Sequence, residues 1–249
     1  MKLLVISDLH IGTGDPLDIF DWRDDDFLAF LTEFREDYGI EGLILNGDIY
    51  ELHKYRLDDI AKARPALMRY FARPDVIYIK GNHDRISPRG LDHYLLVNPA
   101  GKRIYFEHGH DADFINGTRP GRVLAAAFFG ALKQAVKFRR VLDFYFRAVE
   151  VNDMIARIPK KYNTYKYLNY ALRLLKKNDV VFLAHTHSLE SHVTWYLNDK
   201  KRYLNSGSCS LGRFQGMVLD TETLKYESVK IDRDEARMRV RSRILSRPA

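Results

Sequence analysis

Small groups of acidic, histidine and amide residues recur along this chain, each directly after a short apolar run. In chain order they are Asp8 and His10; Asp48; Asn82, His83 and Asp84; His108; and His185 and His187. Carboxylate, amide and imidazole groups are typical ligands of divalent metal ions in proteins. Two cations that share one carboxylate need several such groups close together, and a pair of this kind can assist hydrolysis at phosphorus. The pattern therefore predicts a metal site.

The spacing within these groups favours a compact site. In the D-x-H and H-x-H segments, an extended backbone would send the first and third side chains to the same side. Glycine precedes Asp48, Asn82 and His110, where it permits a tight turn and a close approach of the backbone to a ligand. We expect each group to follow a strand, since strand ends place ligands rigidly.

The apolar runs predict the elements that position these residues. Before residue 110 we expect two helices and four strands: helices Asp24–Tyr38 and Leu57–Phe71, and strands Lys2–Ser7, Leu43–Asn46, Val76–Lys80 and Arg103–Glu107. After residue 178 we expect strands at Val180–Ala184, His192–Leu197, Arg202–Asn205, Phe214–Leu219 and Leu224–Ile231. The alternation of helices and strands indicates a layered α/β fold.

Composition limits the class of protein. The chain has 249 residues, 46% of them hydrophobic and 29% charged, which suits one globular domain over residues 1–249. The single cysteine, Cys209, excludes an intramolecular disulfide framework and a cysteine-based zinc site. The apolar run at the N-terminus is too short for a signal peptide, and no run approaches the roughly 20 apolar residues of a membrane span. We expect a cytoplasmic protein.

A basic segment interrupts the α/β pattern at about residues 119–178. It contains 14 Lys or Arg and three acidic residues, a balance of +11, while the whole chain carries +7. We expect two helices there, Arg122–Val149 and Tyr162–Lys177, separated near Ile158-Pro159. The insert could bury one helix face on the core, form a cap that holds an apolar substrate tail against anionic lipid, or bind nucleic acid. An Arg-rich tail follows at about residues 232–249.

The ordered groups resemble the motifs of the calcineurin-like metallophosphoesterase superfamily: D-x-H, G-D, G-N-H-D/E, an isolated H, and G-H-x-H. All five occur here in order, with Ala184 in place of the last glycine. The resemblance implies an α-β-β-α sandwich with a helical insert, and a metal-dependent phosphoesterase that hydrolyses phosphate esters or anhydrides.

The resemblance also implies a role for each residue. One metal would be held by Asp8, His10, Asp48 and His187, and the other by Asp48, Asn82, His108 and His185. His83 would protonate the leaving group or contact the phosphate, with Asp84 orienting it, while Arg85 and His110 are candidates for substrate contact. His53, His93 and His192 match no motif, so we expect them to be structural or surface residues. The cofactor would be two divalent ions, Mn²⁺ first, with Fe, Zn, Co and Ni also compatible.

The position of the insert resembles the UDP-2,3-diacylglucosamine pyrophosphohydrolases, as do the runs Asp8–Gly12 and Gly47–Glu51. That group has Arg in place of His83 and Asp in place of His110. The resemblance still implies a phosphorylated small molecule or lipid as substrate, and we rank a lipid-linked or nucleotide-linked pyrophosphate first. A phosphodiesterase or nuclease ranks second and a non-catalytic scaffold third. An anionic membrane surface could bind the basic insert and make the protein peripheral; nucleic acid ranks below it as a partner.

Overall fold

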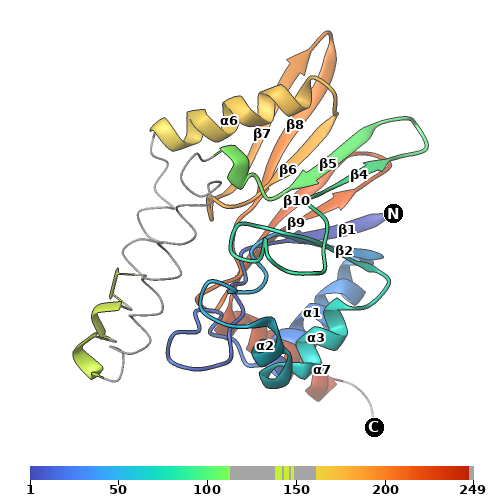
Figure 1. Ribbon diagram of the computed structural model, residues 1–249. Helices are drawn as coiled ribbons and strands as arrows, with labels where there is room; N and C mark the ends of the chain where they lie inside the picture. Colours follow the sequence, from blue (N-terminus) through green and yellow to red (C-terminus); the bar gives the residue numbers. More distant parts are fainter. Residues whose placement is uncertain (113–137, 142, 146, 149–160, 247–249) are drawn as a thin grey trace.

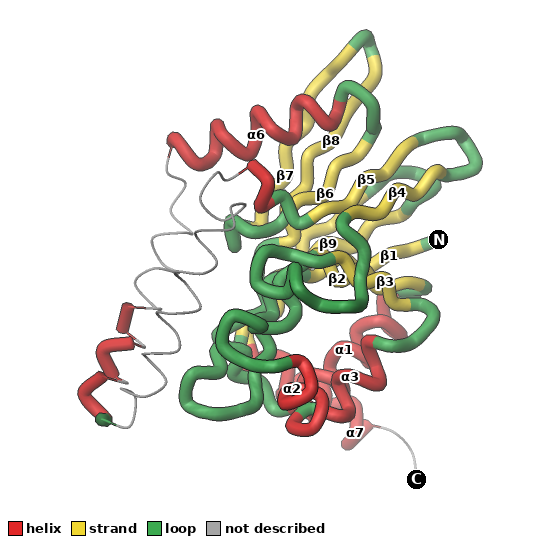
Figure 2. Tube along the Cα trace, viewed as in Figure 1, coloured by secondary structure: helices red, strands yellow, loops and turns green. Residues whose placement is uncertain are grey.

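The computed structural model describes residues 1–112, 138–141, 143–145, 147–148 and 161–246. Two five-stranded sheets pack face to face, as Figures 1 and 2 show. The first sheet has the order β10-β9-β1-β2-β3 and comprises β1 (Lys2–Ile6), β2 (Gly42–Asn46), β3 (Val76–Ile79), β9 (Arg213–Asp220) and β10 (Tyr226–Asp232). The second has the order β4-β5-β6-β8-β7 and comprises β4 (His93–Val97), β5 (Arg103–Glu107), β6 (Val180–Leu183), β7 (Leu189–Tyr196) and β8 (Asp199–Ser206).

Helices cover the outer face of each sheet (Figure 1). They are α1 (Asp24–Tyr38), α2 (Leu57–Ala63), α3 (Pro65–Phe71) and α7 (Arg233–Ser246) on the first sheet and α6 (Lys161–Leu175) on the second, with a 3₁₀ turn, η1, at His110–Ala112. Successive residues of β1 point to opposite sides. Leu4 packs under α1, and Leu3 and Val5 pack against the second sheet. The expected α-β-β-α sandwich is therefore confirmed.

Parallel pairing brings the ligand-bearing loops to one edge of the sandwich. Strand β2 pairs in parallel with β1 and with β3, and β6 pairs in parallel with β5 and with β8. The residue groups singled out above follow the carboxyl ends of β1, β2, β3, β5 and β6. Since the carboxyl ends of parallel strands lie together, five loops distant in sequence meet at one place.

One expectation about the elements is corrected, and the structure adds two elements that the sequence did not predict. The helix expected at Leu57–Phe71 is two helices, because Arg64 leaves the helical region at φ −125° and Pro65 begins a new one. Strand β4 was not expected, and it is an edge strand whose two end residues are exposed. The Arg-rich tail is largely the helix α7, where Arg237 Nε donates to Asp26 Oδ2 of α1 over 2.8 Å.

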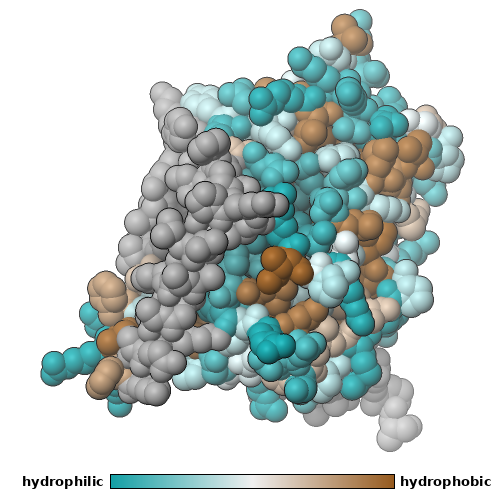
Figure 3. Space-filling model, in the orientation of Figure 1, coloured by the Kyte–Doolittle hydropathy of each residue, from teal (hydrophilic) through white to brown (hydrophobic). Residues whose placement is uncertain are grey.

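The described part of the insert agrees with helical structure. Helix α6 confirms the expected Tyr162–Lys177 helix, and its Ala171 and Leu175 pack on β6. Most of the expected Arg122–Val149 helix and the break near Ile158-Pro159 lie outside the described residues, although 139–141, 143–145 and 147–148 are helical. There the side chains of Phe138 and Phe144 are exposed, as are those of Arg139 and Arg140. Hydrophobic and hydrophilic atoms lie side by side at the lower left of Figure 3, where Figure 1 draws this helical segment. Among the described helices, none is long and apolar enough to cross a membrane.

Candidate metal centre

Two adjoining groups of histidine and carboxylate side chains lie where the five loops meet, and a third group, His10–Asp48–His83, shares one residue with each of them. In the groups Asp8–His10–His187 and Asp48–His108–His185, one ligand atom per residue lies within 4.8 Å of the others. His187 Nε2 is 3.3 Å from Asp8 Oδ1, and His108 Nε2 is 3.2 Å from Asp48 Oδ2. His10 Nε2 joins the groups, since it lies 4.0 Å from Asp8 Oδ1 and 3.9 Å from Asp48 Oδ2. The clusters are therefore consistent with a two-metal site.

Buried side-chain atoms without a hydrogen-bond partner show whether the site suits cations. His10 Nε2 and Asn82 Oδ1 are buried and have no hydrogen-bond partner among the described residues. A buried polar atom without a partner is rare because it loses its hydration and gains nothing in return. Both atoms have lone pairs that suit a divalent cation, and both lie on loops that also hold a carboxylate, Asp8 or Asp84. The donor set therefore fits divalent metal ions.

The tautomer of His108 prepares it for metal binding. Its Nδ1 lies 3.0 Å from the backbone oxygen of Asn46. A carbonyl oxygen only accepts, so Nδ1 carries a hydrogen and Nε2 faces Asp48, where it can bind a cation once a metal ion displaces its own proton. The pKa of His108 is raised to about 10, because the carboxylates of Asp48 and Asp8 outweigh the opposing effect of burial. A field that negative also attracts metal cations.

The backbone at the candidate ligands is unusual. Asp8, His10 and Asp48 have φ of 52°, 50° and 52°, and His185 and His187 have φ of 69° and 56°. These values are left-handed and uncommon for residues other than glycine, and such strain persists where surrounding structure imposes it, often at functional sites. The expectation that extended D-x-H and H-x-H segments align their side chains is therefore wrong. Left-handed turns bring these ligands together instead.

Two glycines make this close approach possible. A Cβ on Gly47, whose φ is +92°, would overlap the ring of His108. A Cβ on Gly81 would overlap the carboxylate of Asp48. Only a residue without a side chain leaves room for the ligands that come from the neighbouring loops.

The carboxylate beside His83 is Glu51. Glu51 Oε1 lies 2.8 Å from His83 Nδ1, and its Oε2 lies 3.3 Å from His10 Nδ1. Asp84, which we expected to orient His83, instead accepts hydrogen bonds from the backbone N–H groups of Gly81, Ile49 and Tyr50. Its carboxylate fixes the two ligand loops to each other, and burial, aided by Asp48, raises the pKa of Asp84 to about 6.

The remaining predicted residues lie at different depths. His110 is buried near His108 and His185, and burial, with the charge of His108, lowers its pKa to about 3. Arg85 is exposed, with Nη1 3.8 Å from Asp111 Oδ1. His53, expected to be an ordinary structural or surface residue, has its ring 4.3 Å from that of His83.

Sequence reasoning missed three residues near His83: Glu51, His53 and Lys54. Glu51, His53 and His83 form a further group whose ligand atoms lie within 4.8 Å of one another. His93 and His192 belong to none of the groups found in the described part of the chain, and they stack on Tyr105 and Tyr203 as structural residues would. The signal in the sequence that could have found these three residues is that they follow the candidate ligand Asp48 closely.

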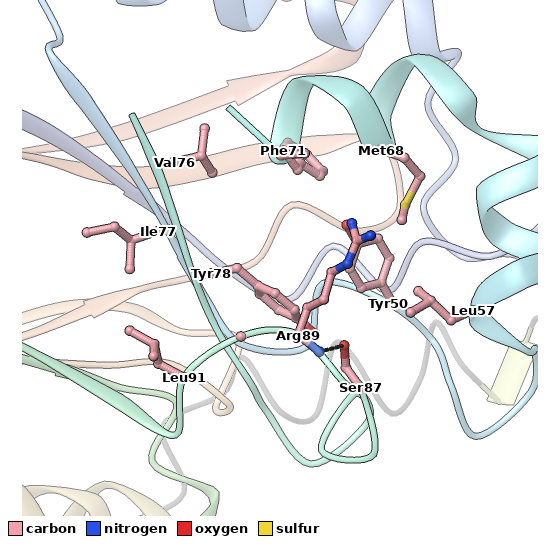
Figure 4. Close-up of a pocket in the computed structure, with 12 residues that line it drawn as sticks. Tyr50, Leu57, Met68, Phe71, Val76, Ile77, Tyr78, Ser87, Arg89 and Leu91 are labelled. Atoms are coloured by element: carbon pink, nitrogen blue, oxygen red, sulfur yellow. Dashed lines mark hydrogen bonds between the residues drawn. The ribbon is translucent and has the colours of Figure 1, made fainter. Parts of the chain in front are cut away.

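An apolar cavity of about 350 Å³ lies behind the ligand loops, between β3, α3 and the loop after Asp84 (Figure 4). Its lining includes Tyr50, Phe71, Ile77 and Leu91, and Arg89 lies against it. None of the candidate metal ligands lines this cavity.

Comparison with known proteins identifies the family. A family model described as calcineurin-like phosphoesterase matches residues 1–189. No curated protein sequence matches the chain. A dimetal phosphatase structure from Danio rerio is 12% identical, covers 94% of this chain and 96% of its own, and has a TM-score of 0.50.

Two further solved structures match at lower TM-scores. An archaeal phosphodiesterase is 16% identical, with 93% of this chain and all (100%) of its own covered and a TM-score of 0.42. A predicted phosphoesterase from Streptococcus pneumoniae is 15% identical, with 94% and 90% covered and a TM-score of 0.40. At these identities the likeness concerns the fold.

Proposed function

Since the chain belongs to the calcineurin-like phosphoesterase family, a family of metal-dependent phosphoesterases, we propose that it hydrolyses a phosphate ester or pyrophosphate with two divalent cations. The observation that carries the proposal is the pair of ligand groups, Asp8–His10–His187 and Asp48–His108–His185, joined by the group His10–Asp48–His83. Asp8, His10, Asp48 and His187 would hold one cation, and Asp48, Asn82, His108 and His185 the other. Mn²⁺ suits this mixture of oxygen and nitrogen ligands.

The bound cations would neutralise charge on the phosphoryl oxygens and activate a water molecule. The chain's own residues would position the substrate and supply a proton. His83 Nδ1 faces the Glu51 carboxylate, which only accepts, so Nδ1 carries a hydrogen and Nε2 faces the metal side, 4.0 Å from Asp48 Oδ2. Although burial opposes protonation, Glu51 and Asp48 raise the pKa of His83 to about 9. A protonated Nε2 can give its proton to the leaving oxygen.

For the substrate, we propose a lipid-linked or nucleotide-linked pyrophosphate. The insert supports this class, because Tyr167 of α6 lies with its ring centroid 5.9 Å from that of His185, so the insert borders the site. Phe138 and Phe144 are 69% and 72% exposed, and Arg139 and Arg140 beside them are exposed as well. Apolar rings and guanidinium groups together favour contact with an anionic lipid surface. Arg85 and His110 remain candidates for contacts with the substrate phosphates.

The second candidate is a phosphodiesterase that acts on other substrates. It is favoured by His83 itself, because the pyrophosphohydrolases that the insert resembles have Arg there. A poor leaving group departs as an alkoxide that needs a proton. An imidazole held by a carboxylate can donate that proton, whereas an arginine cannot.

A substrate panel separates the two candidates. With Mn²⁺ supplied, the lipid-linked proposal predicts a kcat/KM for a UDP-linked acylated sugar far above that for the deacylated sugar. The same enzyme should hydrolyse bis-p-nitrophenyl phosphate slowly. Equal kcat/KM values for the acylated and deacylated substrates, with faster cleavage of nucleic acid or cyclic nucleotide, would favour the second candidate.

A further inference from the structure

A buried lysine lies behind the two imidazoles that Glu51 contacts. Lys54 is 6% exposed, and its Nζ is 3.6 Å from Glu51 Oε2. The same Nζ donates to the hydroxyl of Tyr145 over 2.8 Å and to the backbone oxygen of Leu17 over 3.4 Å. Burying an ammonium is unfavourable unless it is paired and hydrogen-bonded, and Lys54 has both kinds of partner.

These contacts form a chain from the insert to the metal site. Tyr145 belongs to the helical residues 143–145, is 8% exposed and packs in the main apolar core. Its hydroxyl contacts Lys54, which pairs with Glu51. Glu51 in turn reaches His83 at 2.8 Å and His10 at 3.3 Å. A residue of the insert is therefore three contacts away from His83.

We propose that Lys54 is a positioning residue for the reaction: it fixes the Glu51 carboxylate between His83 and His10, and Tyr145 of the insert fixes Lys54. The inference rests on the proposed function, in which His83 protonates the leaving group. Its Nζ pairs with the Glu51 carboxylate, so Lys54 acts on the imidazoles through Glu51. The insert then contributes to catalysis through the docking of one tyrosine, apart from any role in binding substrate.

The arrangement explains why a lysine is buried there. Glu51 uses Oε1 for His83, while Oε2 is shared between Lys54 and His10. Without a group on the far side of Oε2, the carboxylate could rotate about its terminal bond and lose the alignment with His83 Nδ1. A supporting residue of this kind is commonly worth a factor of about 10–100 in activity when it is removed.

Lys201 provides a matched control. It is also a buried lysine, 8% exposed, and its Nζ lies 3.0 Å from Asp179 Oδ1. Asp179 otherwise accepts from the backbone N–H of Arg103 and pairs with Lys102, and it contacts none of the candidate metal ligands. Lys201→Met removes a buried ion pair of the same type without touching the site.

The experiment compares the hydrolysis of bis-p-nitrophenyl phosphate and diphenyl phosphate by Mn²⁺-loaded protein. Lys54→Met should lower kcat for diphenyl phosphate about 10–100-fold, with a much smaller loss for the nitrophenyl ester and little change in KM. Tyr145→Phe keeps the ring and should change the two kcat values in the same direction but less. This variant still tests the inference if Lys54→Met fails to fold. Lys201→Met should lower Tm and leave the ratio of the two kcat values unchanged.

His83→Ala separates the failure of this inference from that of the proposed function. If His83→Ala lowers both rates equally, the acid role of His83 is wrong and the inference falls with it. If His83→Ala changes the ratio but Lys54→Met and Tyr145→Phe do not, only the role of Lys54 is wrong. If Lys54 acts only through His83, the double variant Lys54→Met/His83→Ala should have the same ratio of the two kcat values as His83→Ala alone. A further change of this ratio in the double variant would overturn the inference.

Discussion

Asp48 and Glu51 lie three residues apart on one loop, each about 1% exposed, and they face opposite nitrogens of the same two imidazoles. Asp48 Oδ2 lies 3.9 Å from His10 Nε2 and 4.0 Å from His83 Nε2. Glu51 lies 3.3 Å from His10 Nδ1 and 2.8 Å from His83 Nδ1. Residues of one chemical type thus have two roles: on the Nε2 side a carboxylate can bind metal, and on the Nδ1 side it orients the ring.

The largest expected effect is on the Nε2 side. Asp48→Ala should reduce hydrolysis of bis-p-nitrophenyl phosphate to background, because both candidate cation sites lose the carboxylate between them. The fold should persist, since Asp48 lies in a loop after β2 and the core remains intact. Activity near that of the wild type at saturating Mn²⁺ would refute the metal assignment, and a circular dichroism spectrum would check the fold.

His83 contacts both carboxylates, so its replacement probes the acid role. His83→Ala should lower kcat by about 10²–10⁴-fold for a poor leaving group, the usual contribution of a general acid. The loss should be smaller for nitrophenolate, which leaves without a proton. A matched change, His93→Ala at the exposed start of β4, should leave both rates unaltered. Equal losses for the two leaving groups would reduce His83 to a positioning role.

On the Nδ1 side the expected effect is smaller. Glu51→Gln should lower kcat by about 10–100-fold while the bound metal stays close to that of the wild type. It also removes the counter-ion of buried Lys54, so the free energy of unfolding should fall by about 3–5 kcal/mol. Loss of bound Mn²⁺ from Glu51→Gln, measured by elemental analysis, would show that Glu51 acts as a ligand instead.

The smallest expected effect on turnover comes from changes in the insert, away from both carboxylates. Arg139→Glu with Arg140→Glu should weaken the affinity for anionic vesicles about 30-fold or more, because basic residues near a bilayer contribute about 1 kcal/mol each. Turnover of bis-p-nitrophenyl phosphate, which needs no lipid contact, should not change. Vesicle binding that survives the double reversal would contradict the lipid-facing insert.

Some of this site could be predicted from the sequence and some could not. The apolar runs give most of the strands, and parallel pairing then brings Asp8, Asp48 and His185 to one edge. The partner of His83 could not be inferred, because Asp84 is its neighbour in sequence whereas Glu51 reaches it only through the fold. Strand β4 was missed although its residues 94–97 are apolar, because a run of five residues at a sheet edge gives only a short signal. Helix α7 is rich in arginine, and among its side chains with described burial only Ala236 belongs to the core.

The central claim is that two cations act together across Asp48. The most direct test is to remove metal with a chelator, dialyse, and titrate Mn²⁺ while following both bound metal per chain and turnover of bis-p-nitrophenyl phosphate. The account predicts no turnover without metal, two Mn²⁺ per chain at saturation, and activity that appears as the second ion binds. Full activity with a single bound ion, or turnover by the metal-free protein, would contradict it.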